Sequence, residues 1–178
     1  MENWKVVTEE DSTLGVYKIN EYATIPTFAT KGSACFDVYT SLASHKEITS
    51  YNHAHSEVVK LKVEEDSVKV YRGFRVMIPT GIIFDIPKGY SVRLHPRSGL
   101  ALKNGVTLVN QEAIIDSDYV QETFVLIENT SMVLFEVTHG MRICQGELVK
   151  NVETQLKETF LPPIEKERKG GFGSTGTK

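Results

Sequence analysis

Short runs of apolar residues separated by turn residues recur along the chain and predict a fold built of β-strands. In YSVRLH (90–95), Val92 and Leu94 share one face while Arg93 and His95 share the other, which is the period-two pattern of a half-buried strand. Further strands are expected at 75–86, 105–110, 113–116, 123–129, 132–137 and 141–145. Many short strands at this spacing indicate an antiparallel sandwich or barrel.

Helical signal is scarce, and its best candidate is SGLALKNG (98–105). Ser98 is expected to cap the first turn, and Asn104-Gly105 is expected to end the helix. Residues 152–160 have weak helical periodicity and fit a strand about as well.

The pattern favours one domain followed by an arm. Residues 44–66 are polar and are interpreted as an excursion from the core, either a solvated loop or a contact surface for another protein. Residues 161–169 begin with a Leu-Pro-Pro stretch and are charged, which is typical of an extended linker. We therefore expect a β-barrel domain over 1–160, with a C-terminal arm and a glycine-rich lid motif over 161–178.

The net charge of the chain bears on which kind of ligand it binds. A net charge of −3 argues against a nucleic-acid polymer, whereas a small anionic ligand needs only a few local cations. No apolar run approaches the ~18 residues of a membrane span, so a soluble, cytoplasmic protein is expected.

Neither the cysteines nor the histidines predict a metal site. Cys35 and Cys144 lack a C-x-x-C spacing, so we expect two buried free thiols rather than a disulfide or a metal pair. His53 and His55 form an H-x-H pair, but it lies in the polar stretch with no third ligand nearby. The other histidines show no cysteine or carboxylate spacing that suggests zinc: His45, His95 and His139.

Three stretches carry candidate chemistry. In HPRSGLA (95–101), Arg97 and Ser98 open a short helix, which suits either an anion site or an N-cap with a surface salt bridge. In IIDSDYVQE (114–122), Asp116 follows two apolar β residues. Its carboxylate is therefore expected to be fixed and partly desolvated, as a general base must be, although D-S-D also forms turns. GGFGSTG (170–176) is either slack or a segment that orders on a ligand, because ordering glycine costs the most entropy.

Five segments together resemble, in order, the motifs of the homotrimeric dUTP diphosphatase (dUTPase) family. They are ACFDVYTS (34–41), HPRSGLA (95–101), GVTLVNQEAIIDSDYVQE (105–122), RICQGELV (142–149) and GGFGSTG (170–176). The second and fifth are the specific ones. The resemblance implies an all-β distorted jelly-roll barrel with one short helix, assembled as a trimer, with a mobile C-terminal arm.

The resemblance also implies roles on the nucleoside side of the site. Asp116 matches the aspartate that positions and deprotonates the water attacking the α-phosphorus of dUTP, which gives dUMP and pyrophosphate. Asn110 matches an asparagine near the pyrimidine, in a hairpin whose main chain reads the uracil edge. Tyr119 matches the tyrosine packed beneath the deoxyribose, which leaves no room for a 2′-hydroxyl.

On the phosphate side, the resemblance implies that Arg97, Ser98 and Gly99 hold the triphosphate, with Gln145 alongside. Mg²⁺ is the implied cofactor, bound mainly by triphosphate oxygens and waters, and Asp37 would act on it through water.

The C-terminal motif is implied to close over bound nucleotide. Phe172 would stack on the uracil, Ser174 and Thr175 would contact the γ-phosphate, and Gly173 would let backbone amides approach phosphate. Arg168, or the lysine after it, would supply the cation that the family places before the phenylalanine.

In such a trimer each site takes motifs one, two and four from one chain, motif three from a second and motif five from a third. The isolated monomer is therefore expected to be inactive. Two other interpretations stay open. One is a dCTP deaminase of the same fold, and the other is a dUTP-binding regulatory protein with weak catalysis.

Overall fold

The computed structural model describes residues 13–52 and 57–161. These residues form short strands and one short helix. In chain order the elements are β1 (Gly15–Lys18), β2 (Thr27–Phe28), β3 (Phe36–Tyr39), β4 (Glu47–Tyr51), β5 (Val58–Lys62), β6 (Ser67–Val70), β7 (Arg75–Pro79), β8 (Ile82–Asp85), β9 (Tyr90–His95), α1 (Ser98–Asn104), β10 (Val106–Leu108), β11 (Ala113–Asp116), β12 (Phe124–Asn129), β13 (Phe135–Thr138) and β14 (Arg142–Lys150).

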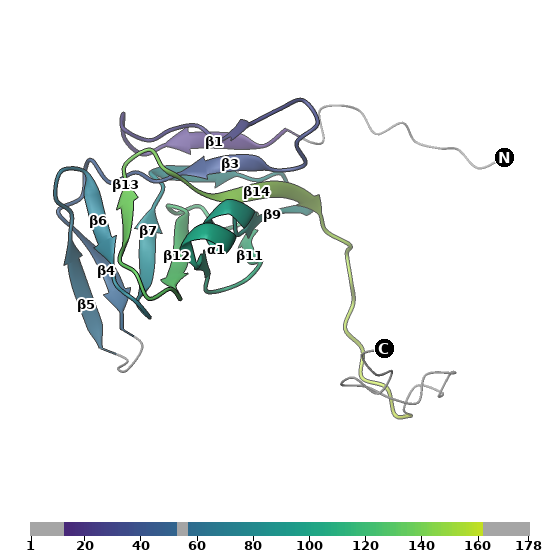
Figure 1. Ribbon diagram of the computed structural model, residues 1–178. Helices are drawn as coiled ribbons and strands as arrows, with labels where there is room; N and C mark the ends of the chain where they lie inside the picture. The colour runs from purple at the N-terminus through teal and green to yellow at the C-terminus, as the bar shows by residue number, and fades with distance from the viewer. Residues whose placement is uncertain (1–12, 53–56, 162–178) are drawn as a thin grey trace.

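The strands form two five-stranded sheets and two strand pairs. One large sheet has the order β10-β12-β7-β4-β5 and the other β11-β9-β14-β3-β2, while β1 pairs with β8 and β13 with β6. Every pairing among the described strands is antiparallel. In Figure 1, β3, β14 and β9 run across the top of the molecule, and β4, β5 and β7 run steeply below them. The predicted antiparallel β architecture is confirmed.

The core lies between the sheets and follows the predicted alternation. Val92 and Leu94 of β9 are fully buried, while Arg93 and His95 on the opposite face are only partly buried. β7 and β12 contribute Ile78 and Ile127, which are also fully buried. Burying one face of each strand stabilises the sheets, because each such side chain contributes about 1.5–3 kcal/mol when removed from water.

Helix α1 forms where it was expected and ends as expected. Gly105 adopts the left-handed conformation, with φ of 63°, and its N–H donates to the carbonyl of Leu100. The predicted cap at the other end is wrong. The helix begins at Ser98, so the N-cap residue is the extended Arg97, and no side chain caps the first turn by a hydrogen bond.

The interpretation of 44–66 as a solvated excursion is wrong for most of that stretch. β4 and β5 pair along their whole length, and β4 joins the large sheet through β7. Ile48, Ser50 and Leu61 are buried, and the Ser50 hydroxyl donates to the Val59 carbonyl at 2.7 Å. The polar residues occupy the outward face of this hairpin. The H-x-H pair at 53–55 lies outside the described residues.

Among the described residues, the last regular element is β14, which ends at Lys150. Residues 151–161 form neither the helix nor the strand considered for 152–160, and all of them are exposed. Leu156 and Phe160 are 98% and 96% exposed. Figure 1 shows this segment leaving the body of the protein. Residues 162–178, including the glycine-rich motif, lie outside the described residues. No helix in the described part of the chain is long and apolar enough to cross a membrane.

Gly146 of β14 tests how tightly neighbouring strands of one sheet pack, because it lies in register with Phe36 of β3 and Leu94 of β9. A Cβ added at Gly146 would lie 2.6 Å from a ring carbon of Phe36 and 3.1 Å from a methyl of Leu94, and both side chains are buried. We expect Gly146→Ala to lower the free energy of unfolding by about 1–3 kcal/mol, measured by urea denaturation. Gly32→Ala is the control, because a Cβ there meets open space. Equal stability of the two variants would contradict tight packing at Gly146.

Candidate active site

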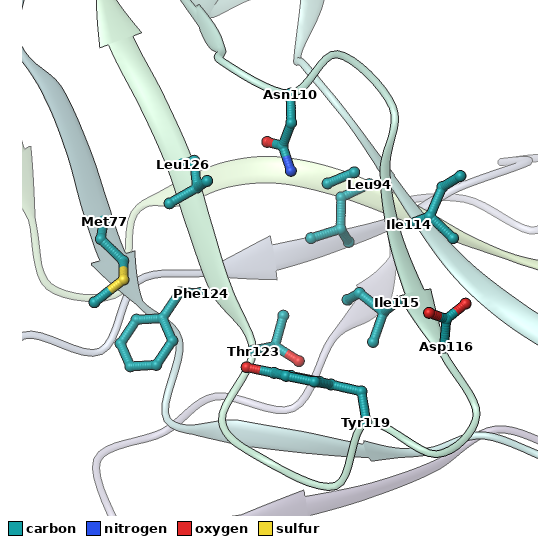
Figure 2. A pocket seen from close by; sticks show the side chains of 11 residues that line it. Met77, Leu94, Asn110, Ile114, Ile115, Asp116, Tyr119, Thr123, Phe124 and Leu126 are labelled. Carbon is teal, nitrogen blue, oxygen red and sulfur yellow. The ribbon is translucent and has the colours of Figure 1, made fainter.

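A pocket of about 290 Å³ opens between β11 and β12, on the side of the molecule that carries the predicted nucleoside residues. Its wall is apolar and includes Ile115 and Leu126. The polar residues Asn110, Asp116 and Tyr119 line the same pocket. In Figure 2, Asn110 and Tyr119 lie at opposite ends of the pocket and Asp116 lies at its side. A largely apolar cavity with a few polar groups is typical of a small-molecule site.

The connection between β10 and β11, which belong to different sheets, places Asn110 at this pocket, and the end of β11 places Asp116 there. β10 ends at Leu108, the Val109 N–H donates to the Leu126 carbonyl at 2.9 Å, and β11 begins at Ala113. The chain reverses between the strands through Glu112, whose φ of 60° is left-handed. Asn110 therefore occupies a turn that is braced against β12.

Asp116 ends β11 as predicted, but its environment differs from the prediction. Ile115 is buried, whereas Asp116 is exposed in the single chain. β11 lies at the edge of its sheet and pairs only with β9, with Asp116 opposite Ser91. Partial desolvation of this carboxylate is therefore absent in the isolated chain and would have to come from a bound ligand or another subunit.

Tyr119 lies in a short turn that follows β11. Its N–H donates to the Asp116 carbonyl at 3.1 Å, and its hydroxyl donates to the Glu122 carbonyl at 3.0 Å. The side chain is 40% exposed, so its ring presents a face to the pocket rather than packing in the core. This placement suits a ring offered to a ligand better than a ring packed in the core.

A second cluster joins Asp37, Arg97 and Arg142. Asp37 Oδ1 lies 3.4 Å from Arg97 Nε, and Asp37 Oδ2 lies 3.1 Å from Arg142 Nη1. Arg97 Nη1 also donates to the Arg142 carbonyl at 2.9 Å. The Asp37 side chain is 12% exposed, so this ion pair is much less screened than a surface pair. The structure thus brings Asp37 and Arg97 together, as the motifs predicted.

Gln145 lies beside this cluster, and its Nε2 donates to the Pro96 carbonyl at 3.3 Å. Ser98 and Gly99 form the first residues of α1 directly after Arg97. A Cβ on Gly99 would meet no atom within 4 Å, so packing inside the chain does not require glycine there. The backbone at Gly99 is left open to a ligand.

Cys144 lies in the core beneath these charges. Burial raises the pKa of the Cys144 thiol far above its ordinary value, Asp37 raises it further, and Arg97 opposes them. The thiol therefore stays protonated and does not act as a nucleophile. Both cysteines are free as predicted, but Cys35 is only partly buried.

Asp116 and the cluster around Asp37 lie at opposite ends of β9. Asp116 is in register with Ser91, whereas Gln145 is in register with both His95 and Asp37. Ser91 and His95 are four residues apart, which is about 13 Å along a strand. A base and phosphate ligands that act on one phosphoryl group must lie within a few ångströms of it. Within one chain, Asp116 therefore lies too far from the Asp37 cluster for the two to act on one phosphoryl group.

A third cluster of titratable side chains could not be recognised from spacing along the sequence. Ligand atoms of His95, Glu112 and Glu147 lie within 4.8 Å of one another, although they come from different strands and a turn. Spacing along the sequence offered no sign that His95 lies beside two carboxylates. His95 Nε2 lies 3.0 Å from Glu147 Oε1, and Arg93 Nη1 lies 3.1 Å from Glu112 Oε2. Glu112 is thus paired with a guanidinium, and Glu147 lies within hydrogen-bond distance of the His95 ring.

Comparison with known proteins decides the family. A sequence model of the family described as dUTPase matches residues 45–176. The chain belongs to the dUTPase family. The deoxyuridine 5'-triphosphate nucleotidohydrolase of Brucella melitensis biotype 2 is 35% identical over 168 residues, covering 93% of this chain and 94% of its own length. The protein of the same name from Roseobacter denitrificans is 40% identical over 118 residues, covering 66% of this chain and 78% of its own.

Solved structures show the same dUTPase fold. A variant of the Staphylococcus bacteriophage 80alpha dUTPase, solved with dUpNHpp, aligns with a TM-score of 0.71 at 20% identity, over 92% of this chain and 98% of its own. A variant of the dUTPase from phage phi11 of S. aureus, whose structure details the coordination of a structural Mg(II) ion, aligns with a TM-score of 0.64 at 18% identity. That alignment covers 84% of this chain and 97% of the phage protein.

The structure describes only some of the residues that the dUTPase motifs predicted for the site. The structure describes Asp37, Arg97, Asn110, Asp116 and Tyr119 and groups them at two places. The predicted residues of the C-terminal motif lie outside the described residues: Arg168, Phe172, Gly173, Ser174 and Thr175. Sequence reasoning missed two residues, Arg142 on Asp37 and Glu122 beside Tyr119. Both stand inside motifs that were recognised, at positions to which no role was given.

Proposed function

We propose that this chain hydrolyses dUTP to dUMP and pyrophosphate by attack of water on the α-phosphorus, with Mg²⁺, in a homotrimer with shared active sites. As a member of the dUTPase family it is a dUTP nucleotidohydrolase. The observation that carries the finer proposal is the pocket in which Asn110, Tyr119 and Asp116 surround one apolar cavity. In this proposal Asn110 contacts the pyrimidine, the Tyr119 ring packs against the sugar, and Asp116 is the general base.

In this mechanism Asp116 holds the attacking water and takes its proton. Its exposed carboxylate is open to water and lies at the side of the pocket. Asn110 and the main chain of the β10–β11 connection contact the uracil edge, and the Tyr119 ring packs beneath the deoxyribose. A ribose 2′-hydroxyl would clash with the ring or lose its hydrogen bonds, which costs about 1–3 kcal/mol or more.

Arg97, Ser98, Gly99 and Gln145 would hold the triphosphate. A guanidinium presents a fork of donors that suits phosphate oxygens. Arg142 and Arg97 place two positive charges against the single negative charge of Asp37, so this cluster keeps a net positive charge for an anion.

The environment of Asp37 fits a metal that is held through water. Both carboxylate oxygens already face guanidinium groups, which disfavours direct coordination of a cation, but each oxygen retains a lone pair for a water. The triphosphate itself would supply the main ligands of Mg²⁺, and the bound ion neutralises phosphate charge.

The separation along β9 supports the shared site. Asp116 of one chain would work with Arg97 of a second chain, and the arm of a third chain would bring Arg168 and the motif with Phe172, Gly173, Ser174 and Thr175. The exposed segment 151–161 has the extended form that such an arm needs. The domain boundaries proposed here are a body through about residue 160 and an arm beyond it.

The test is pyrophosphate release in Mg²⁺ from dUTP, dTTP, dCTP and UTP in parallel, with an EDTA arm. We expect fast release from dUTP, release at least about 10²-fold slower from the other three, and loss of activity in EDTA. Ammonia from dCTP would instead indicate a deaminase. Binding of dUTP without pyrophosphate release would indicate a regulatory binding protein.

A further inference from the structure

The turn that carries Tyr119 is tied to a distant part of the fold through Glu122. Glu122 makes two hydrogen bonds that matter here. Its carbonyl accepts from the Tyr119 hydroxyl at 3.0 Å, and its Oε1 accepts from the Gly81 N–H at 2.8 Å. The position of the tyrosine hydroxyl is therefore linked to the turn between β7 and β8.

That turn is a fixed point in the structure. Gly81 has a φ of +67°, and a Cβ there would lie 2.8 Å from both Ala23 Cβ and Ser41 Oγ. The Gly81 carbonyl accepts from the Ile19 N–H at 2.8 Å. Close packing on one side and a hydrogen bond on the other leave the Gly81 N–H little freedom to move.

The rest of the Tyr119 turn contributes little to its own rigidity. Val120 is 71% exposed and Gln121 is also exposed, so neither packs on the body. Beyond Glu122, Thr123 returns to the sheet, where its N–H donates to the Ile82 carbonyl at 2.9 Å. The Glu122 carboxylate is thus one of two side-chain anchors at this point, beside the Thr80 hydroxyl, which donates to the Thr123 carbonyl, and it is the one that comes from the turn itself.

We infer that Glu122 is a positioning residue that holds the Tyr119 ring at the height needed to reject ribonucleotides. This inference rests on the proposed role of Tyr119 beneath the deoxyribose. Rejection by a clash works only if the ring cannot move aside, because a movable ring lets the 2′-hydroxyl in. Figure 2 shows the Tyr119 ring across one end of the pocket, where a small tilt would change the space next to it.

The experiment compares kcat/KM for dUTP and UTP in the full-length protein. Glu122→Ala removes the acceptor for the Gly81 N–H, and we expect the dUTP/UTP ratio to fall about tenfold. Glu122→Gln keeps a carbonyl acceptor at the same place, and we expect the ratio to stay within about twofold of the parent. A purely structural role would change activity on both nucleotides together and leave the ratio unmoved.

Two further variants separate this inference from a general loss of stability. Tyr119→Phe removes only the hydroxyl and leaves the Glu122–Gly81 bond intact, so it tests the anchor even if Glu122→Ala does not fold. We expect it to lower the ratio as well, and the double variant to lower it no further. Ser50→Ala is the matched control, because it deletes one buried hydrogen bond in the β4–β5 hairpin and should leave the ratio unchanged.

The outcomes separate the inference from the proposed function. An unchanged ratio in both Glu122→Ala and Tyr119→Phe, with a lowered ratio in Tyr119→Ala, would overturn the anchor and leave the role of the Tyr119 ring in place. An unchanged ratio in Tyr119→Ala would remove that role, and the inference with it.

Discussion

Replacing Asp116 by asparagine is expected to slow dUTP hydrolysis about 10³-fold while dUTP still binds. Asparagine has nearly the same shape but cannot accept a proton, so the water in the site would no longer be activated. Because Asp116 is exposed at the side of the pocket, its loss removes no packing that holds the β10–β11 connection. Removing its negative charge also reduces repulsion of the triphosphate, so affinity should hold or rise.

Single-turnover pyrophosphate release and calorimetric binding of dUTP measure the two effects separately. Asp118→Asn is the matched control, because Asp118 is an exposed aspartate two residues further along the same turn. We expect it to retain most of its activity. An Asp116→Asn protein with more than about a tenth of the parent rate would exclude Asp116 as the general base.

Deleting residues 170–178 is expected to lower kcat about 10²-fold without dissociating the proposed trimer. Both halves of the site are open in the described structure: Asp116 is exposed, and the backbone at Gly99 faces empty space. A segment that closes over the nucleotide would exclude water and fix the phosphates, and its loss would leave the substrate bound but poorly placed. The expected change is therefore mainly in kcat.

Steady-state kinetics and light scattering on the same samples test this prediction. A chain lacking only residues 177–178 keeps GGFGSTG and serves as the control, with activity close to the parent's. Full activity in the longer deletion would disprove the lid, and a dissociated trimer would show that the tail holds subunits together instead.

The sequence predicted the strands best where apolar and polar residues alternate strictly. β9 followed its pattern over residues 92–95, where Val92 and Leu94 point into the core, although Ser91 on the other face is buried too. The sequence did not predict the β4–β5 hairpin, because one of its inward-facing residues is the polar Ser50. The Ser50 hydroxyl is satisfied by a hydrogen bond across the hairpin. Residues 152–160 carry apolar side chains, but the chain offers them no surface to pack on.

The sequence predicted those site residues that belong to short motifs. Arg97, Asp116 and Tyr119 were found because neighbouring residues in the sequence define their motifs. Arg142 meets Asp37 across 105 positions, and Glu122 meets Gly81 across 41. Contacts of that length depend on strand order and register, which local patterns do not determine.

A genetic consequence follows from the positions of Asp116, beside one end of β9, and Ser98, which comes shortly after its other end. If each site in the proposed trimer draws these residues from different chains, a chain faulty at one of them spoils a site that its neighbour completes. Two gene copies that are faulty at different ends of β9 would then rescue each other in mixed trimers. Two copies faulty at the same end would not.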